Sequence, residues 1–380
     1  MINLQNTEVQ YLLLFTILLI LPKLLLRFQI PIGISSIFLG IGAGLGLGWF
    51  QGDDLLLMLS RLGITSLFLF AGFEVEFEEL KQNWKELLGG VAQTMSITLV
   101  VAFVIHLFFS IGFRAATLIA LGIMTPSTGF ILNSLKNYGF SEGQEYWIRS
   151  KAISKEISAI LLLFITLQSE SLVNLGSSTL ILVALSIFLP LSYKLFFKYI
   201  APYAKDSEVG FLILTALICG VITKKIGTYY LVGAFLVGFI ASEFKHFGKS
   251  EKSEEILKNL QMFFSFFIPF YFFKAGVGFT EDLFTLEGLY IGLAFLGIFI
   301  PLRIFNTYSN MKFFMQDFWP DRKEITVSLL PTLIFGLVMA QIAKERFQVP
   351  LEIISGLVIY TLVSSVIPAF IFKKVPPENY

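Results

Sequence analysis

Two adjacent charged residues, Lys155 and Glu156, stand within RSKAISKEISAIL, an otherwise largely apolar stretch at residues 149–161. If this stretch crosses a membrane, each charge costs on the order of 2.5–3.5 kcal/mol near the bilayer centre, so function or internal pairing must retain it. Adjacent helical residues do not face each other, so we expect each side chain to meet a partner on another helix or in a cavity. A carboxylate held in this way can bind a proton or a cation and exchange one for the other.

The remaining ionisable residues do not form the patterns of an enzyme or a metal centre. His106 and His246 lie in different segments without ligand-type neighbours, and Cys219 is the single cysteine. The sequence contains no H-E-x-x-H motif, no paired catalytic carboxylates within a helix and no Ser/His/Asp set. We therefore predict a protein that is not an enzyme, with no catalytic residues, metal site or bound cofactor.

The composition indicates which elements must position the charged pair. Hydrophobic residues make up 56% of the chain and charged residues 14%, and the mean hydropathy is +0.78. These values are typical of an all-α polytopic membrane protein, whose surroundings are the lipid bilayer. Apolar runs of roughly 17–25 residues recur along the chain, and we count about 13. The predicted spans are 8–27, 31–50, 55–73, 86–111, 115–137, 146–168, 177–200, 208–223, 228–243, 258–279, 286–309, 324–343 and 350–372.

Basic residues fall mainly in alternate loops, from Lys23 and Arg27 to Lys373 and Lys374. By the positive-inside rule, this pattern places the N-terminus outside and the C-terminus in the cytoplasm. The first run lacks the flanks of a signal peptide, so we predict a retained helix. Without organelle signals, the predicted location is the plasma (inner) membrane. The net charge of +1 says nothing useful about partners, and no nucleic-acid partner is predicted.

Two apolar runs carry a proline that interrupts a helix in mid-membrane. Pro126, within IMTPSTGF, removes a backbone donor, and Pro331 occupies a similar place in LLPTLIFG. The hydroxyls beside Pro126 belong to Thr125, Ser127 and Thr128. Each broken run is the middle member of a helix triplet, and the odd spacing between the triplets inverts their topology. The pattern favours inverted repeats with an ion site between the broken helices, and two ordinary proline kinks are the alternative.

Glycines line one face of the second apolar run, FLGIGAGLGLGWF. Gly40, Gly44 and Gly48 recur every four residues, so another helix can approach this face closely. The G-x-G-x-x-G spacing of a dinucleotide site is absent. We therefore predict helix packing here.

Four further segments occur in a characteristic order. They are LFLFAGFEVEFEEL (67–80), IALGIMTPSTGFILNSLKNYGF (119–140), GAFLVG (233–238) and IPFYFFKAGVG (268–278). The order and spacing of these four segments resemble those of Kef-type members of the monovalent cation:proton antiporter superfamily. The resemblance extends over nearly the whole chain. The resemblance implies a sodium/proton antiporter-like fold with inverted repeats and two interrupted crossing helices, assembled as a homodimer.

In that superfamily, a pair of residues in the sixth helix binds the cation and the proton in competition, and a basic residue follows in the eleventh helix. The resemblance places this ion site at the charged pair. The predicted site residues are Glu156, Lys155, Thr125, Ser127 and Thr128, with Arg303 as a compensating charge and Pro126 and Pro331 at the helix breaks. Lys274 is a second candidate compensating charge, whose amine either lines an outward-facing funnel or reaches the headgroups. A permanent ion pair of Glu156 with Lys155 or Arg303 is the structural alternative.

Three positions depart from the superfamily's pattern: Lys155, Met124 and Thr332. Lys155 replaces the first member of the pair and lowers the local negative charge, so we predict electroneutral exchange of Na⁺ or K⁺ for protons by alternating access. Met124 and Thr332 stand where relatives often carry a hydroxyl or a charge, which places the selectivity for Na⁺ or K⁺ in question.

The predicted organisation is one integral membrane domain over residues 1–380, without a cytoplasmic regulatory domain. Its core comprises about 86–168 and 258–372, and its scaffold and dimer elements comprise about 8–73 and 177–243.

Two other functions remain as alternatives. An anion transporter on the same fold would use Lys155, Lys274 and Arg303 to attract its substrate. A degenerate, non-transporting membrane subunit would have a regulatory or assembly role, and would bind an unidentified protein partner through the charged cytoplasmic loop 243–260.

Overall fold

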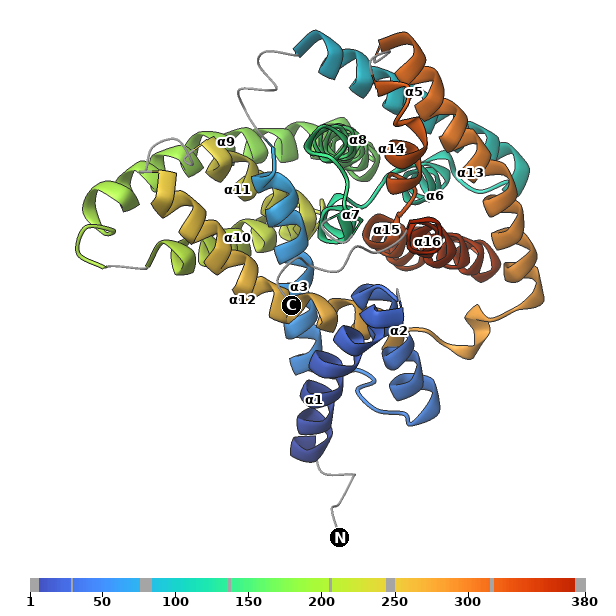
Figure 1. The fold of residues 1–380 in the computed structure, drawn as a ribbon, viewed down its shortest axis with the longest axis horizontal. Helices are drawn as coiled ribbons and strands as arrows, with labels where there is room; N and C mark the ends of the chain where they lie inside the picture. The colour runs from blue at the N-terminus through green and yellow to red at the C-terminus, as the bar shows by residue number, and fades with distance from the viewer. Residues whose placement is uncertain are drawn as a thin grey trace. The chain divides into compact units, whose positions relative to one another are not determined.

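The computed structural model describes residues 7–28, 30–75, 84–135, 138–204, 207–243, 250–314 and 318–372. All regular elements in these ranges are helices (Figure 1). Ten are long and apolar enough to cross a membrane, and two shorter apolar helices cover Ile32–Gly46 and Tyr230–Ser242. Together with the charged helix α8 (Glu142–Gln168), they account for the thirteen predicted spans. The chain is a multi-pass membrane protein, as predicted.

The apolar runs form helices because a helix satisfies its own backbone hydrogen bonds in hydrocarbon. The N-terminal half contains α1 (Thr7–Leu25), η1 (Leu26–Phe28), α2 (Ile32–Ile41), the π-helical turn η2 (Gly42–Gly46), α3 (Asp54–Phe73), α5 (Trp84–Phe109), α6 (Phe113–Met124), α7 (Thr128–Leu135) and α8 (Glu142–Gln168). The C-terminal half contains α9 (Leu172–Tyr199), α10 (Ser207–Lys225), α11 (Tyr230–Glu243), α12 (Ser250–Val277), η4 (Glu281–Leu283), α13 (Leu286–Phe314), α14 (Arg322–Ser328), α15 (Leu333–Phe347) and α16 (Leu351–Ile371).

Contacts divide the chain into two compact units. Unit 1 consists of Met1–Gly63, Gly122–Arg149 and Phe266–Tyr380, and unit 2 of Ile64–Leu121 and Ser150–Ser265. The helices α3, α6, α8 and α12 contribute residues to both. This division by contacts differs from the predicted division into core and scaffold. The predicted division concerns which parts move against each other during transport, and it stays a prediction.

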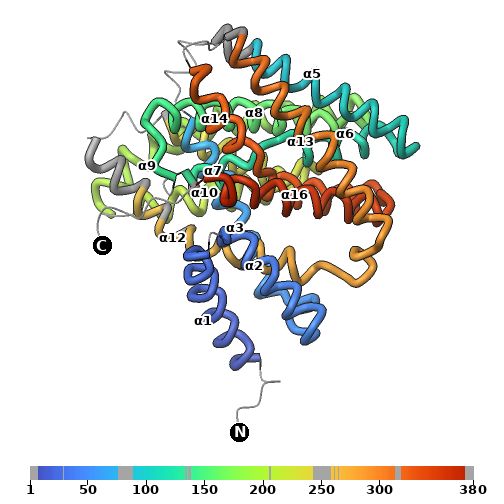
Figure 2. The backbone as a smooth tube through the Cα atoms, turned by 45° about the vertical axis from the view of Figure 1, so that its right-hand side comes forward, coloured from blue at the N-terminus to red at the C-terminus, as the bar shows by residue number. Residues whose placement is uncertain are grey.

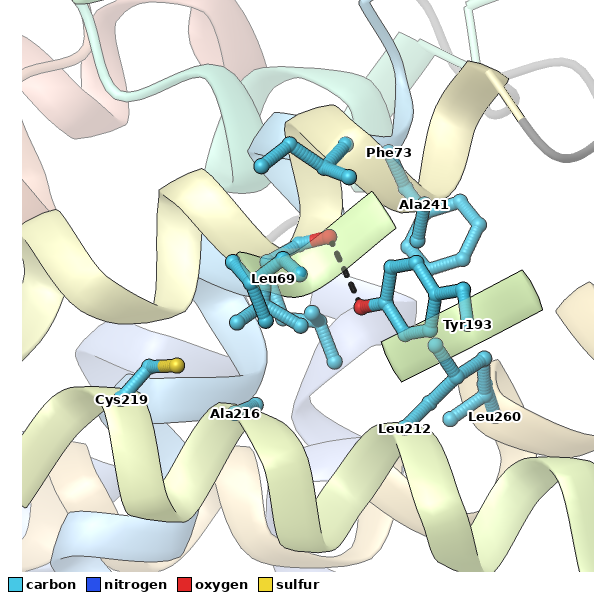
Figure 3. Close-up of a cluster of buried hydrophobic side chains, with 11 residues drawn as sticks. Leu69, Phe73, Tyr193, Leu212, Ala216, Cys219, Ala241 and Leu260 are labelled. Atoms are coloured by element: carbon cyan, nitrogen blue, oxygen red, sulfur yellow. Dashed lines mark hydrogen bonds between the residues drawn. The ribbon is translucent and has the colours of Figure 1, made fainter. Parts of the chain in front are cut away.

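Unit 2 packs around a cluster of buried side chains from α3, α9, α10, α11 and α12 (Figure 3). Tyr193 is 1% exposed, and its hydroxyl donates to the carbonyl of Val237 at 3.4 Å, as a buried tyrosine requires. The free thiol of Cys219 is buried in the same cluster, where it packs like a small apolar side chain. The other members are Leu69, Phe73, Leu189, Leu212, Ala216, Ile240, Ala241 and Leu260.

Glycines bring α2 and η2 against α12 within unit 1. A Cβ at Gly40 would lie 2.1 Å from the carbonyl oxygen of Phe273, and one at Gly44 would lie 2.9 Å from that of Val277. Gly48 instead follows η2 in a turn with φ of +67°, and nothing lies within 4 Å of its would-be Cβ. The predicted packing face is therefore confirmed for Gly40 and Gly44. It is wrong for Gly48, because the helical segment ends before that residue.

The helices α13 and α16 form a second close packing in unit 1 (Figure 2). A Cβ at Gly292 would lie 2.8 Å from Cβ of Ile359, and one at Gly356 would lie 2.5 Å from Cγ2 of Ile291. Because the backbones approach so closely, the two helices have little freedom to slide past each other.

We expect Gly40→Ala to lower the melting temperature of the detergent-solubilised protein. The added methyl group overlaps the Phe273 carbonyl and separates α2 from α12, and overpacking of this kind typically costs about 1–3 kcal/mol. Gly42→Ala is the matched control, because nothing lies within 4 Å of a Cβ at that position. Equal melting temperatures for the two variants would contradict the close packing of α2 on α12.

Candidate functional site

The two interrupted helices break where the prolines predict, and the two breaks touch within unit 1 (Figure 1). One break covers residues 125–127 and contains Pro126, and the other covers 329–332 and contains Pro331. The N–H of Ser127 donates to the carbonyl of Pro331 at 2.9 Å. We call these two breaks the crossover. The prediction of two interrupted crossing helices is confirmed.

Ser127 caps the start of α15 from the other broken helix. Its Oγ accepts hydrogen bonds from the N–H of Ile334 at 2.8 Å and of Phe335 at 3.3 Å. The first N–H groups of a helix have no partner within it, and a serine hydroxyl usually bonds the second or third of them. The local candidate, Thr332, does not make a cap bond, and its hydroxyl lies 3.2 Å from that of Ser364. Ser127 therefore stabilises the second break from the first.

Arg303 caps the C-terminal end of α14. Its side chain is 4% exposed, with Nη2 donating to the carbonyl of Leu329 at 2.6 Å and Nη1 to that of Leu330 at 2.8 Å. The last carbonyls of a helix carry partial negative charge, so a cation there is stabilising. The positive charge predicted to compensate the site thus lies at the crossover, where it offsets the dipole of α14.

Tyr360 of α16 extends this arrangement to α6. Its fully buried hydroxyl accepts from Nη1 of Arg303 at 3.1 Å and donates to the carbonyl of Ile123 at 3.2 Å. One tyrosine hydroxyl therefore bonds the end of α6 directly and is linked to the end of α14 through Arg303. Tyr360 was not among the predicted site residues, because a hydroxyl within an apolar run is the only signal of it in the sequence.

The hydroxyls predicted as ligands are buried at the crossover. Thr125, Ser127 and Thr128 are each at most 3% exposed. Within the described part of the chain, Thr128 Oγ1 has no hydrogen-bond partner. Lys274 is half-buried in the last turn of α12, where the helix dipole stabilises a positive charge.

Lys155 and Glu156 lie in the part of α8 that belongs to unit 2. Glu156 is 3% exposed and Lys155 is half-buried, and each takes part in at least one polar or electrostatic interaction. The crossover belongs to unit 1, so the meeting of Glu156 with the crossover hydroxyls in one ion site stays a prediction.

The helix that carries this pair begins with a capping box. The N–H of Gln144 donates to Ser141 Oγ at 3.3 Å, and the N–H of Ser141 donates to Gln144 Oε1 at 3.0 Å. Gln144 Nε2 also donates to Asp321 Oδ1 at 2.8 Å. Because Asp321 directly precedes α14, this bond ties the start of α8 to the start of a broken helix within unit 1.

Two other predictions concern metal sites and a protein-binding loop. Among the described residues, no group of three or more His, Cys, Asp or Glu could hold a metal ion. Of the loop 243–260 that would bind a protein partner, residues 244–249 lie outside the described ranges.

Comparisons with known proteins relate this geometry to one family. The family described as "Sodium/hydrogen exchanger, transmembrane" matches residues 12–374. Probable Na(+)/H(+) antiporter 3 of Methanocaldococcus jannaschii is 28% identical over 381 residues, covering 96% of this chain and 95% of that protein. The Na(+)/H(+) antiporter of Enterococcus hirae is 24% identical, covering 93% and 94%.

A solved structure shares the fold. The sodium proton antiporter MjNhaP1 from Methanocaldococcus jannaschii, at pH 8, matches with a TM-score of 0.65 over 96% of this chain and 95% of that chain. The sequence identity is 14%, so the likeness concerns the backbone fold. It confirms the predicted antiporter-like fold.

We expect Ser127→Ala to lower the free energy of unfolding by about 0.5–2 kcal/mol, because α15 loses its cap. Thermal melting in detergent measures the change, and Ser127→Thr, which keeps a hydroxyl, should lose less. Ser186→Ala is the control, since that exposed hydroxyl donates to the Leu182 carbonyl of its own helix. A melting temperature for Ser127→Ala equal to the control's would argue against a cap across the crossover.

Proposed function

The chain belongs to the sodium/hydrogen exchanger family, and from that premise we propose that it exchanges Na⁺ or K⁺ for protons through Glu156 by alternating access. It is a membrane antiporter and not an enzyme. The observation that carries the assignment of Glu156 is its burial: the carboxyl side chain is 3% exposed halfway along a helix of a membrane exchanger. Such a group is costly in a bilayer unless it is paired or functional.

In this proposal the proton and the cation compete for the Glu156 carboxylate. A bound proton neutralises it, and a bound cation replaces that proton, so one site carries either ion but not both. Lys155, the adjacent residue, lowers the net negative charge around the exchanging group. This difference from an acidic pair supports electroneutral exchange. A single carboxylate binds one proton or one monovalent cation at a time, so each cycle exchanges one positive charge for another.

The crossover hydroxyls are proposed as neutral ligands for the cation. A hydroxyl oxygen has two acceptor lone pairs, and Ser127 Oγ already accepts from two backbone N–H groups. Thr125 and Thr128 are therefore better ligand candidates than Ser127. Arg303 and Lys274 are proposed as compensating charges, and no cofactor beyond the transported ions is proposed.

The finer classification is also part of the proposal. The four segments that resemble Kef-type antiporters support that subfamily, a homodimer, and a core that rocks against a dimerising scaffold. The distribution of Lys and Arg supports a plasma membrane location with the N-terminus outside and the C-terminus in the cytoplasm.

The contacts of Arg303 favour cation exchange over the anion alternative. Two of its guanidinium nitrogens donate to the carbonyls of Leu329 and Leu330, and one of them also donates to Tyr360. A guanidinium engaged in this way is occupied by the protein's own acceptors.

We expect Glu156→Gln to abolish cation-dependent proton flux in proteoliposomes that contain an internal pH dye, with Na⁺, K⁺ and Li⁺ tested in turn. The amide cannot bind and release the exchanged proton. Glu142→Gln is the matched control, since this exposed carboxylate lies in the first turn of the same helix and should leave the flux unchanged. Native flux in Glu156→Gln, or no flux with any cation from folded native protein, would sink the proposed mechanism.

Electroneutral exchange predicts a rate that is independent of membrane potential. Moving one net charge per cycle through 100 mV is worth about 2.3 kcal/mol, so an electrogenic exchanger would respond strongly. The measurement compares initial Na⁺-driven proton flux at zero potential and at a potential set by an ionophore, with protein-free liposomes as the control. A clear change in initial rate with potential would rule out electroneutrality.

A further inference from the structure

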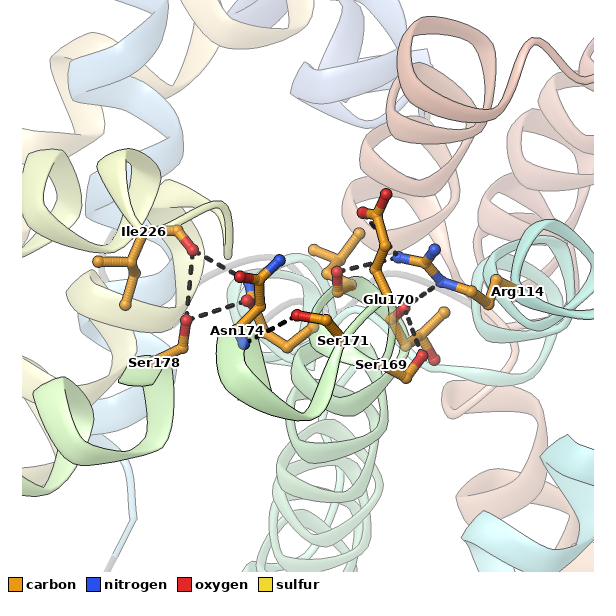
Figure 4. A network of polar contacts seen from close by, with 10 residues as sticks. Arg114, Ser169, Glu170, Ser171, Asn174, Ser178 and Ile226 are labelled. Atoms are coloured by element: carbon orange, nitrogen blue, oxygen red, sulfur yellow. Dashed lines mark hydrogen bonds and ion pairs between the residues drawn. The ribbon is translucent and has the colours of Figure 1, made fainter. Parts of the chain in front are cut away.

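The C-terminal end of α8 is fastened to α6 by a polar network that lies wholly within unit 2 (Figure 4). Arg114, in the first turn of α6, donates from Nε to the carbonyl of Thr166 at 2.9 Å and from Nη2 to that of Leu167 at 3.0 Å. Glu170 lies 3.9 Å from the same guanidinium, but its side chain is 73% exposed. The part-buried contacts with the two carbonyls, rather than the surface ion pair, therefore define the attachment.

These bonds supply donors near the open C-terminal end of the helix. The last four carbonyls of a helix have no partner within it. The carbonyl of Ile165 accepts from the N–H of Ser169 at 2.8 Å, and that of Thr166 also accepts from Ser169 Oγ at 3.2 Å. Arg114 supplies the donor for Leu167 and a second donor for Thr166, and its charge complements the negative end of the α8 dipole.

Gln168, the last residue of α8, makes a second attachment. It is 4% exposed, and its Nε2 donates to the carbonyl of Ile226, just after α10, at 3.1 Å. Its Oε1 accepts from the hydroxyl of Ser178, on α9, at 2.9 Å. The end of α8 is thus bonded to α6 through Arg114 and to α9 and the end of α10 through Gln168 (Figure 4).

The fastened end is rigidly connected to Glu156. Thr166 follows Glu156 by ten residues in one continuous helix, and no proline or glycine lies between them. At 1.5 Å per residue the separation is about 15 Å along the axis. Helices bend sharply mainly at proline, at glycine or where the ladder is interrupted, so an axial shift at Thr166 moves Glu156 by a similar amount.

We propose that Arg114 is a positioning residue for ion exchange, which sets the depth of Glu156 by holding the carbonyls of Thr166 and Leu167. This inference rests on the proposed role of Glu156. Arg114 lies too far along the helix to touch an ion at Glu156, so it acts through the position of α8. A side chain with only a structural role would change the melting temperature of the protein and leave its ion affinity unaltered.

The test compares Arg114→Gln, Arg114→Lys and Glu170→Gln in proteoliposomes. For Arg114→Gln we expect KM for Na⁺ to rise roughly tenfold, because displaced ligands bind more weakly. We expect kcat to stay within about twofold of native, because the change weakens ion binding equally in the ground state and in the transition state. Arg114→Lys keeps one charged donor and should restore part of the affinity. Glu170→Gln removes only the exposed ion pair and should behave like the native protein.

Hydrogen–deuterium exchange supplies a readout that does not depend on transport. We expect amides near the end of α8, around residues 165–170, to exchange faster in Arg114→Gln than in Glu170→Gln. Faster exchange together with a raised KM supports the proposal. A native KM in Arg114→Gln overturns it, whether or not exchange at the helix end is faster.

The same assays separate this inference from the proposed function. If Glu156→Gln is inactive and Arg114→Gln has a native KM, the positioning role fails and the ion site stands. If Glu156→Gln still exchanges ions, the proposed ion site fails, and the positioning role that depends on it fails with it.

Discussion

A helix that breaks inside a membrane leaves backbone N–H and C=O groups without water to bind them, and each break creates one open C-terminus and one open N-terminus. The crossover meets this constraint with side chains from elsewhere in unit 1. Ser127 serves the start of α15, Arg303 serves the end of α14, and Tyr360 serves the end of α6. Each break therefore depends on groups outside its own helix, and the two breaks stabilise each other.

The same constraint explains what two arginines of this protein bind, the buried Arg303 and the partly exposed Arg114. Arg303 in unit 1 donates to the two carbonyls that directly follow α14, and Arg114 in unit 2 donates to two of the last carbonyls of α8. A charge is costly in hydrocarbon, and a helix C-terminus offsets part of that cost. A buried basic residue in this chain is thus no sign of an ion site by itself. Glu156 differs, because it lies halfway along an uninterrupted helix.

The elements of the fold could be predicted from the sequence, but most of the partners could not. Hydropathy identifies the spans and Pro126 and Pro331 mark the breaks, because both signals are local. The contact between Ser127 and Ile334 joins residues 207 positions apart, and no local pattern reports it. Tyr360 was missed because a single hydroxyl in an apolar run gives no indication of its partners. Gly48 was misassigned because its four-residue spacing continues past the end of the helical segment.

The density of bonds at the crossover limits how transport can occur. Arg303 makes charge-assisted bonds to two carbonyls, and bonds to a charged group contribute about 1.5–3 kcal/mol each. Ser127 and Tyr360 add further buried hydrogen bonds, and their loss would leave buried polar groups without a hydrogen-bond partner. Rearranging the crossover during transport would break several of these buried bonds at once, so we expect alternating access to move the crossover as an intact body.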